Sequence, residues 1–161
     1  MKTRSMIRGW RHRASLLPMI LCLLAVAGSA TAGSAIPPEH NYTLWCTGCH
    51  RPDGAGNPQG GIPDFRNSVG YFAALPEGRM YLTHVPGVMD SGLDATGIAE
   101  VLNYVIHRWG GESTPADYVP FTGTEVENLL ETEIHDVVPL RRKLVNQLQE
   151  QGISVADYPW P

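Results

Sequence analysis

The feature that most constrains this chain of 161 residues is the short stretch Cys46-Thr47-Gly48-Cys49-His50. It has the pattern Cys-x-x-Cys-His, which is typical of covalent haem c attachment. Two residues between the cysteines place both thiols on one helical turn, where each sulfur can add to a vinyl group of the haem. Histidine is the usual proximal ligand of haem iron. We therefore expect one covalent haem c, held by Cys46 and Cys49 and ligated by His50.

Three other interpretations of the motif compete with haem attachment. A Cys-x-x-Cys pair can be half of a structural zinc site, but such a site needs four ligands. The other cysteine, Cys22, lies in a segment that we expect to be removed. A thioredoxin-like redox pair favours a βαβ context, which does not follow here, and a chance match is the third alternative. The export signal favours haem attachment over all three.

The first 32 residues have the three parts of a secretory signal peptide. Five basic residues open the chain, and no acidic residue precedes Glu39. An apolar run covers residues 16–28, and Ala30-Thr31-Ala32 is a small-x-small cleavage sequence. A membrane anchor is the alternative, but the run is shorter than the ~20 residues that a spanning helix needs. We expect cleavage near Gly33, a periplasmic location and no membrane span in the mature chain.

Loss of that segment would make the protein strongly acidic. The full chain has 12 Lys and Arg against 16 Asp and Glu. Without residues 1–32 it keeps seven of the basic residues and all of the acidic ones, which gives a net charge of −9. This charge argues against nucleic-acid binding, because a basic patch is the usual footprint of that class. It suits a partner protein with a basic docking face. The alternative is that the charge only maintains solubility.

The residues after the signal are about one domain and are expected to form helices separated by Gly- and Pro-rich turns. A short helix from Pro38 leads into the motif, and residues 51–67 form a loop. Two short helices at 68–75 and 77–85 follow, interrupted by Pro76 and ended by Pro86-Gly87. The strongest helix covers residues 95–109, with Asp94 as N-cap and an apolar stripe made of Ile98, Val101, Leu102, Val105, Ile106 and Trp109. The expected fold class is all-α.

The motif and the residues after it resemble a class I cytochrome c. Residues 49–56 read C-H-R-P-D-G-A-G and are followed by Pro63-Asp64-Phe65, whereas the family pattern is often C-H-x-x-D-G-x-G with a later proline. The resemblance covers about residues 38–109 and implies a cytochrome c fold around one haem, in a domain at 33–109. It also implies that the carbonyl of Pro63 accepts a hydrogen bond from Nδ1 of His50, which would orient the ring and tune the metal. The alternative for Pro63 is an ordinary loop proline.

The second axial ligand is open to three interpretations. Met89 has the family's position, in a Pro-Gly-containing loop before the last cytochrome helix, and thioether ligation raises the reduction potential. Met80 is expected mid-helix, where filling the core is the more ordinary role of a thioether. His84 is the rival of Met89 and would make a bis-His site of lower potential. The third interpretation is an open distal position.

Residues 110–161 exceed what a minimal cytochrome c needs. We expect a linker at 110–115 and then a two-helix extension. A capping box at Thr122 and Glu125 opens the first helix, and the second runs from about Val137 to Gln151. Glutamates of the first helix are followed by the basic triple Arg141-Arg142-Lys143. These charges either pair within the molecule or form a docking element for a redox partner or a second copy.

Together these expectations describe a soluble periplasmic monohaem cytochrome c that carries single electrons between periplasmic redox proteins and is not an enzyme. His50 and Met89 would cap the iron from both sides. The alternative is a haem enzyme, or a gas or redox sensor, with an open or displaceable distal site. In that case His84 or Asp90 could supply an acid–base group.

Overall fold

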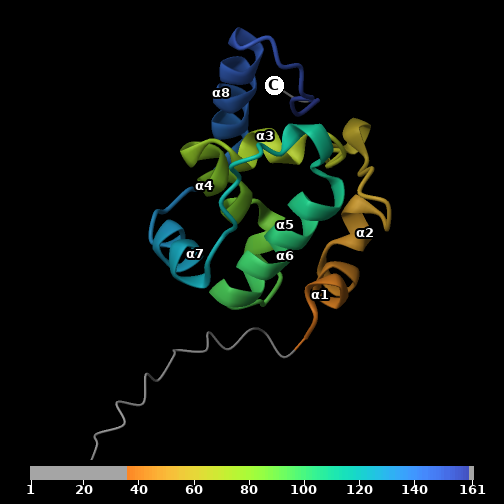
Figure 1. Cartoon of the computed structure of the whole chain (residues 1–161), viewed down its shortest axis with the longest axis vertical. Helices are drawn as coiled ribbons and strands as arrows, with labels where there is room; N and C mark the ends of the chain where they lie inside the picture. The colour runs from red at the N-terminus through yellow and green to blue at the C-terminus, as the bar shows by residue number, and fades with distance from the viewer. Residues whose placement is uncertain (1–35, 160–161) are drawn as a thin grey trace, which may run out of the picture. The chain divides into compact units, whose positions relative to one another are not determined.

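A computed structural model describes residues 36–159, and their regular structure is helical (Figure 1). Within that range the extended pairing is one isolated bridge between Asn57 and Ile62. The all-α class expected from the sequence is therefore confirmed for the described residues. The expected signal peptide, residues 1–32, lies outside them. None of the helices between residues 36 and 159 is both long enough and apolar enough to cross a membrane.

The first helix, α1 (Pro38–Trp45), leads directly into the motif. A proline occupies its first turn, where the fixed φ suits a helix and the missing N–H costs nothing. Cys46 ends α1, and Thr47–His50 form the short helix α2. The chain then turns at Arg51, whose φ of 61° is uncommon for a residue other than glycine. The hydroxyl of Tyr42 donates to the Arg51 carbonyl oxygen at 2.6 Å and stabilises this turn.

Three short helices follow the loop: α3 (Val69–Ala73), α4 (Pro76–His84) and α5 (Pro86–Met89). From the sequence, Pro76 was expected to interrupt a helix and Pro86 to end one. Each proline instead takes the first position of a new helix, where its missing N–H is tolerated. The prediction of a loop at Met89 was therefore wrong, because Met89 is the last residue of α5.

The long helix α6 (Ala95–Trp109) has the predicted limits and the predicted cap. The side chain of Asp94 accepts a hydrogen bond from the N–H of Gly97 at 2.7 Å. Figure 1 shows α6 between α1 and α7, and it packs against both and against α3. The residues of its stripe that are buried are Ile98, Val101, Leu102, Val105 and Ile106.

The C-terminal residues form α7 (Gly123–Leu130) and α8 (Val137–Glu150). α7 packs against α4 and α6, and α8 packs against α4. Val126 and Leu144 are 0% exposed, so both helices contribute to the same core as the residues before them.

The stretch expected to be a linker is packed as well. Gly111–Ser113 form a 3₁₀ turn, and the side chain of Ser113 is buried. Its hydroxyl accepts a hydrogen bond from the N–H of Gly70 on α3 at 2.9 Å and donates to the Gly110 carbonyl at 2.6 Å. This segment therefore joins α6 to α3 instead of spanning open solvent.

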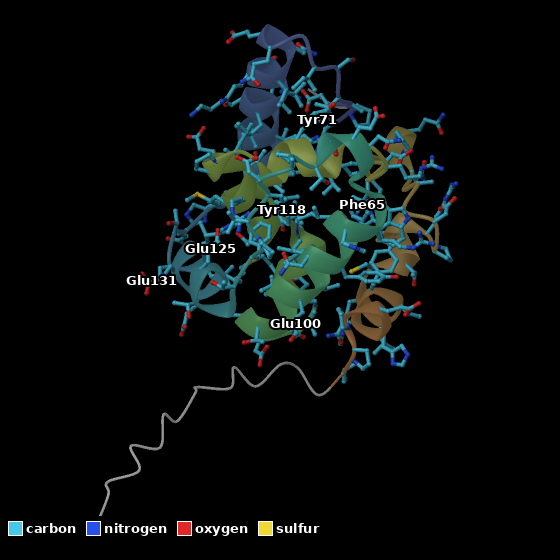
Figure 2. The ribbon with its side chains drawn as sticks, viewed as in Figure 1. Phe65, Tyr71, Glu100, Tyr118, Glu125 and Glu131 are labelled. Carbon is cyan, nitrogen blue, oxygen red and sulfur yellow. The ribbon has the colours of Figure 1, made fainter. Side chains whose placement is uncertain are left out.

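One half of the predicted capping box forms at the start of α7. The hydroxyl of Thr122 accepts a hydrogen bond from the N–H of Glu125 at 3.1 Å. The carboxylate of Glu125, which is labelled in Figure 2, pairs with Arg79 on α4. The basic triple likewise pairs outside α7, since Lys143 binds Glu77 on α4 at 2.7 Å.

Candidate functional site

The motif residues at the junction of α1 and α2 line one cavity. Cys46, Cys49 and His50 all contribute to its wall. Both cysteines are free thiols; Cys46 is half-buried and Cys49 is exposed. Burial, with a smaller contribution from Cys49, raises the pKa of the Cys46 thiol to about 11. Cys46 is therefore a neutral thiol at pH 7.

The imidazole of His50 is held through its Nδ1 atom, which lies 3.2 Å from the carbonyl oxygen of Pro63. A carbonyl oxygen only accepts, so Nδ1 is the donor. Burial lowers the pKa of His50 to about 4, although the bond to Pro63 opposes this shift. At neutral pH the ring is neutral, and with the proton on Nδ1 its lone pair lies on Nε2. This is the form in which an imidazole binds a metal, and the Pro63 contact implied by the family resemblance is present.

Two glycines allow the loop that carries Pro63 to lie against α2. Gly56 has φ +62°, and a Cβ atom there would lie 2.4 Å from the Pro63 carbonyl oxygen. Its N–H donates to the His50 carbonyl at 3.1 Å. Gly54 has φ +74°, and a Cβ atom there would lie 2.9 Å from the ring of Trp109. Both positions of the D-G-x-G pattern thus require the absence of a side chain.

Phe65 gives the His50 ring a second support. The two rings stack with centroids 3.9 Å apart and planes 17° from parallel. Phe65 comes from the same loop as Pro63, and Figure 2 labels its side chain. A hydrogen bond at Nδ1 and a stacked ring together set the orientation of the imidazole.

The cavity has a volume of about 660 Å³, within the roughly 300–1,000 Å³ usual for cofactor and ligand sites. Its wall is largely apolar, with side chains from α3 to α6 that include Phe72, Leu82, Val85, Val88, Val101, Leu102 and Val105. The connection between α7 and α8, and α8 itself, add Ile134, Val137 and Val138. The extension therefore forms part of the cavity wall.

Met89, the expected second axial ligand, lines the same cavity as His50. Met89 is 51% exposed at the end of α5. The structure thus brings Met89 to the site without fixing its thioether by packing.

His84, the alternative second ligand, also lines the cavity, but it is buried and both of its ring nitrogens contact backbone carbonyl oxygens. Its Nδ1 lies 2.8 Å from the carbonyl oxygen of Met80, and its Nε2 lies 2.8 Å from the carbonyl oxygen of Thr132. Thr132 belongs to the connection between α7 and α8. Nε2 would have to leave this contact before it could bind a metal.

Sequence reasoning missed a polar cluster in the cavity wall. Arg141, Tyr81 and Tyr158 all line the cavity. Arg141 is 3% exposed and donates to the Tyr81 hydroxyl at 3.0 Å. The hydroxyls of Tyr81 and Tyr158 are 2.8 Å apart. One signal could have found Arg141: it precedes Leu144 by three residues and Leu148 by seven, the spacing of the buried face of a helix.

Between residues 36 and 159, no group of three or more His, Cys, Asp or Glu side chains is placed to hold a metal ion. The zinc interpretation of the motif therefore has no ligand set in that range. In comparisons with known proteins, no family model matches this chain and no curated protein matches it. The functional inference rests on the geometry of the site.

Proposed function

We propose that this chain is a monohaem c-type cytochrome that carries single electrons between periplasmic redox proteins. The observation that carries the proposal is the placement of Cys46, Cys49 and His50 on the wall of a largely apolar cavity, with the imidazole tied to Pro63 through Nδ1. Two free thiols and one oriented, neutral imidazole within five residues are the donor set that covalent haem requires.

The residues present fit haem c. Cys46 and Cys49 would hold the macrocycle through two thioether bonds, and His50 would bind the iron through Nε2. Met89 is the nearest match to the second axial ligand, since it lines the same cavity and, unlike His84, has no hydrogen bond to give up. The bound haem supplies one-electron redox chemistry. The chain itself orients the imidazole through Pro63 and Phe65 and surrounds the site with a largely apolar wall, both of which tune the reduction potential.

The arrangement of the helices supports a class I cytochrome c fold for this proposal. The motif directly follows α1, and α1 packs against α6, the pair of helices that cross in that family. The proposal includes export by residues 1–32, because haem c is attached outside the bacterial cytoplasm. It also includes a redox partner with a basic docking face, which the acidic composition of the chain would attract.

The first test is the visible spectrum of the periplasmic protein, oxidised and reduced, with and without carbon monoxide. We expect haem that stays with the protein after acid–acetone extraction, narrow reduced bands, a weak near-infrared sulfur-to-iron band when oxidised, and no response to carbon monoxide. The matched control is the double variant Cys46→Ala, Cys49→Ala, from which haem should be extractable. A protein without covalent haem would contradict the proposal. High-spin features or ready carbon monoxide binding would instead favour the open-site enzyme or sensor.

A further inference from the structure

The buried guanidinium of Arg141 forms its hydrogen bonds with neutral groups, and the one carboxylate within ion-pair distance, that of Asp157, lies 4.0 Å away. Its side chain comes from α8 and is 4% exposed. Nη1 donates to the Tyr81 hydroxyl at 3.0 Å, and Nη2 donates to the carbonyl oxygen of Ala156. The guanidinium carbon lies 4.8 Å from the ring centroid of Phe72 and 5.1 Å from that of Tyr158. These contacts hold the side chain in place, but none of them supplies a negative charge.

One donor of this guanidinium lacks an acceptor. Nε of Arg141 is buried and forms no hydrogen bond. The nearest carboxylate, that of Asp157, lies 4.0 Å away, beyond hydrogen-bond distance. The other oxygen of Asp157 accepts from Nε of Arg142 at 3.2 Å, so this carboxylate is shared between two arginines. A buried cation with an unused donor is costly unless an anion pairs with it.

Arg141 lines the same cavity as Cys46, Cys49 and His50. Among the described residues that line the cavity, Arg141 is the only lysine or arginine. The carboxylates in that wall are Asp64, Asp90 and Asp136. Asp64 already pairs with Arg66 at 2.6 Å, and Asp136 caps α8. Any anionic group that enters the cavity therefore meets a single strong cation.

We propose that Arg141 of the C-terminal extension is the anchor of a haem propionate. This inference rests on the proposed function, because haem c brings two carboxylates into a cavity that otherwise binds an apolar ring. A carboxylate beside the guanidinium would neutralise its charge, and charge-assisted bonds of this kind are about twice as strong as neutral ones. The extension is then part of the cofactor site, which gives its close packing a functional reason.

The test titrates the propionates of the holoprotein directly. Haem labelled with ¹³C at both propionate carboxyl carbons is produced by feeding labelled 5-aminolaevulinate, and each carboxyl is followed by NMR against pH. In the unsubstituted protein we expect one propionate to titrate well below the other, by about one to three pH units, because a neighbouring arginine stabilises a carboxylate by that amount. Arg141→Gln should abolish this difference, and Arg141→Lys should restore part of it.

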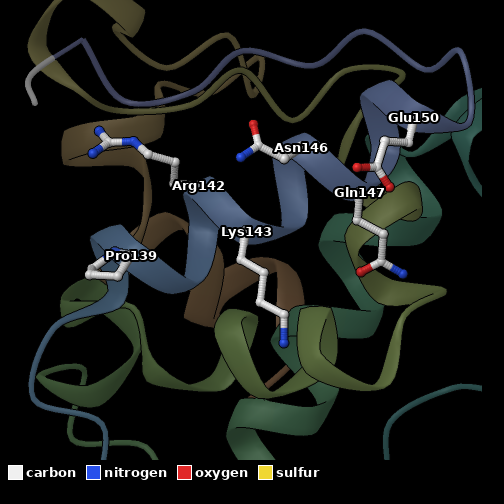
Figure 3. A pocket seen from close by; sticks show the side chains of 6 residues that line it. All are labelled: Pro139, Arg142, Lys143, Asn146, Gln147 and Glu150. Atoms are coloured by element: carbon white, nitrogen blue, oxygen red, sulfur yellow. The ribbon is translucent and has the colours of Figure 1, made fainter.

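The matched control is Arg142→Gln. Arg142 is the next residue of α8, but it lines a separate shallow hollow on the outer face with Lys143 and Glu150 (Figure 3). Its side chain is 40% exposed. Arg142→Gln should leave both propionate titrations unchanged.

Two results would overturn the role of Arg141 and leave the proposed function standing. The first is covalent haem whose two propionates both titrate in the ordinary range in the unsubstituted protein. The second is an equal effect of Arg141→Gln and Arg142→Gln on the propionate titrations. The first needs no variant, so it holds even if Arg141→Gln fails to fold. A chain that carries no covalent haem overturns the proposed function as well.

Discussion

Arg79 on α4 and Glu125 on α7 form a two-point ion pair, with Nε 2.5 Å from Oε1 and Nη2 2.6 Å from Oε2. The guanidinium carbon of Arg79 also lies 3.7 Å from the ring centroid of Phe121, and Nη1 donates to the Val119 carbonyl at 3.0 Å. The Arg79 side chain is 14% exposed, so water screens the pair only in part. One side chain of α4 thereby holds the start of α7.

Replacing Arg79 should loosen that attachment. We expect Arg79→Gln to lower the free energy of unfolding by about 2 kcal/mol, because it leaves the Glu125 carboxylate without its partner in a half-buried place. Urea unfolding followed by circular dichroism measures the change. The control is Arg66→Gln, which breaks a pair with Asp64 whose side chains are 49% and 34% exposed and should cost less than about 1 kcal/mol. Equal losses in the two variants would contradict the expectation.

Leu144 tests whether the extension unfolds together with the rest of the chain. Its side chain is 0% exposed on α8, so Leu144→Ala leaves a cavity and should cost about 2–5 kcal/mol. The matched control is Leu44→Ala on α1, where the side chain is 65% exposed and the change should stay within about 0.5 kcal/mol. We expect one cooperative urea transition that shifts as a whole in Leu144→Ala. Loss of α8 alone, in an earlier separate transition, would show that the extension is an appendage.

Gly56→Ala should displace the carbonyl that orients His50. The new Cβ would lie 2.4 Å from the Pro63 carbonyl oxygen, and the φ of +62° is strained for alanine, so we expect a loss of about 1–3 kcal/mol in unfolding free energy. The reduction potential of the Gly56→Ala holoprotein should also be higher. An imidazole that has lost its Nδ1 hydrogen bond is a less basic ligand and stabilises ferric iron less. Gly48→Ala, with no atom within 4 Å of its Cβ, is the control. An unchanged potential in Gly56→Ala would argue against the role of Pro63.

Met89→Ala tests the second axial ligand. Loss of a thioether ligand should remove the near-infrared sulfur-to-iron band and lower the reduction potential, because methionine ligation raises it. Redox titration and absorption spectroscopy of the holoprotein measure both. The control is Met80→Ala, which removes the thioether within α4 and should leave the band in place. If Met89→Ala keeps the spectrum and the potential, Met89 is not the ligand.

The raised pKa of Cys46 predicts slow alkylation in the haem-free chain. Thiolate is the reactive form, so at pH 8 a thiol with a pKa of about 11 is only about one part in a thousand reactive. Iodoacetamide labelling of a double variant, Cys22→Ala and Cys49→Ala, isolates Cys46, and its rate should keep rising up to about pH 11. The same variant unfolded in urea should react about a hundredfold faster at pH 8, because unfolding removes the burial that raises the pKa. Equal rates in the folded and unfolded chain would contradict the burial of Cys46.

Local signals in the sequence were sufficient for several elements. The apolar stripe and the Asp94 cap predicted both limits of α6, since periodicity and capping act within a few residues. The glycines after the motif indicated a loop, and the contact between His50 and Pro63 followed from the family pattern. The short helices were harder, because a proline such as Pro86 ends one helix or begins another according to how the following turn packs.

The sequence alone predicted the all-α class that residues 36–159 show, with two thiols and an imidazole on one turn. It did not reveal that α7 and α8 would close the same cavity, that Arg141 would be buried in its wall, or that Nε2 of His84 would face Thr132. His84 and Thr132 are 48 residues apart, and Arg141 and Tyr81 are 60 apart. Such contacts arise from how separate helices pack and from which buried polar groups they leave to be satisfied, and no local pattern carries that information.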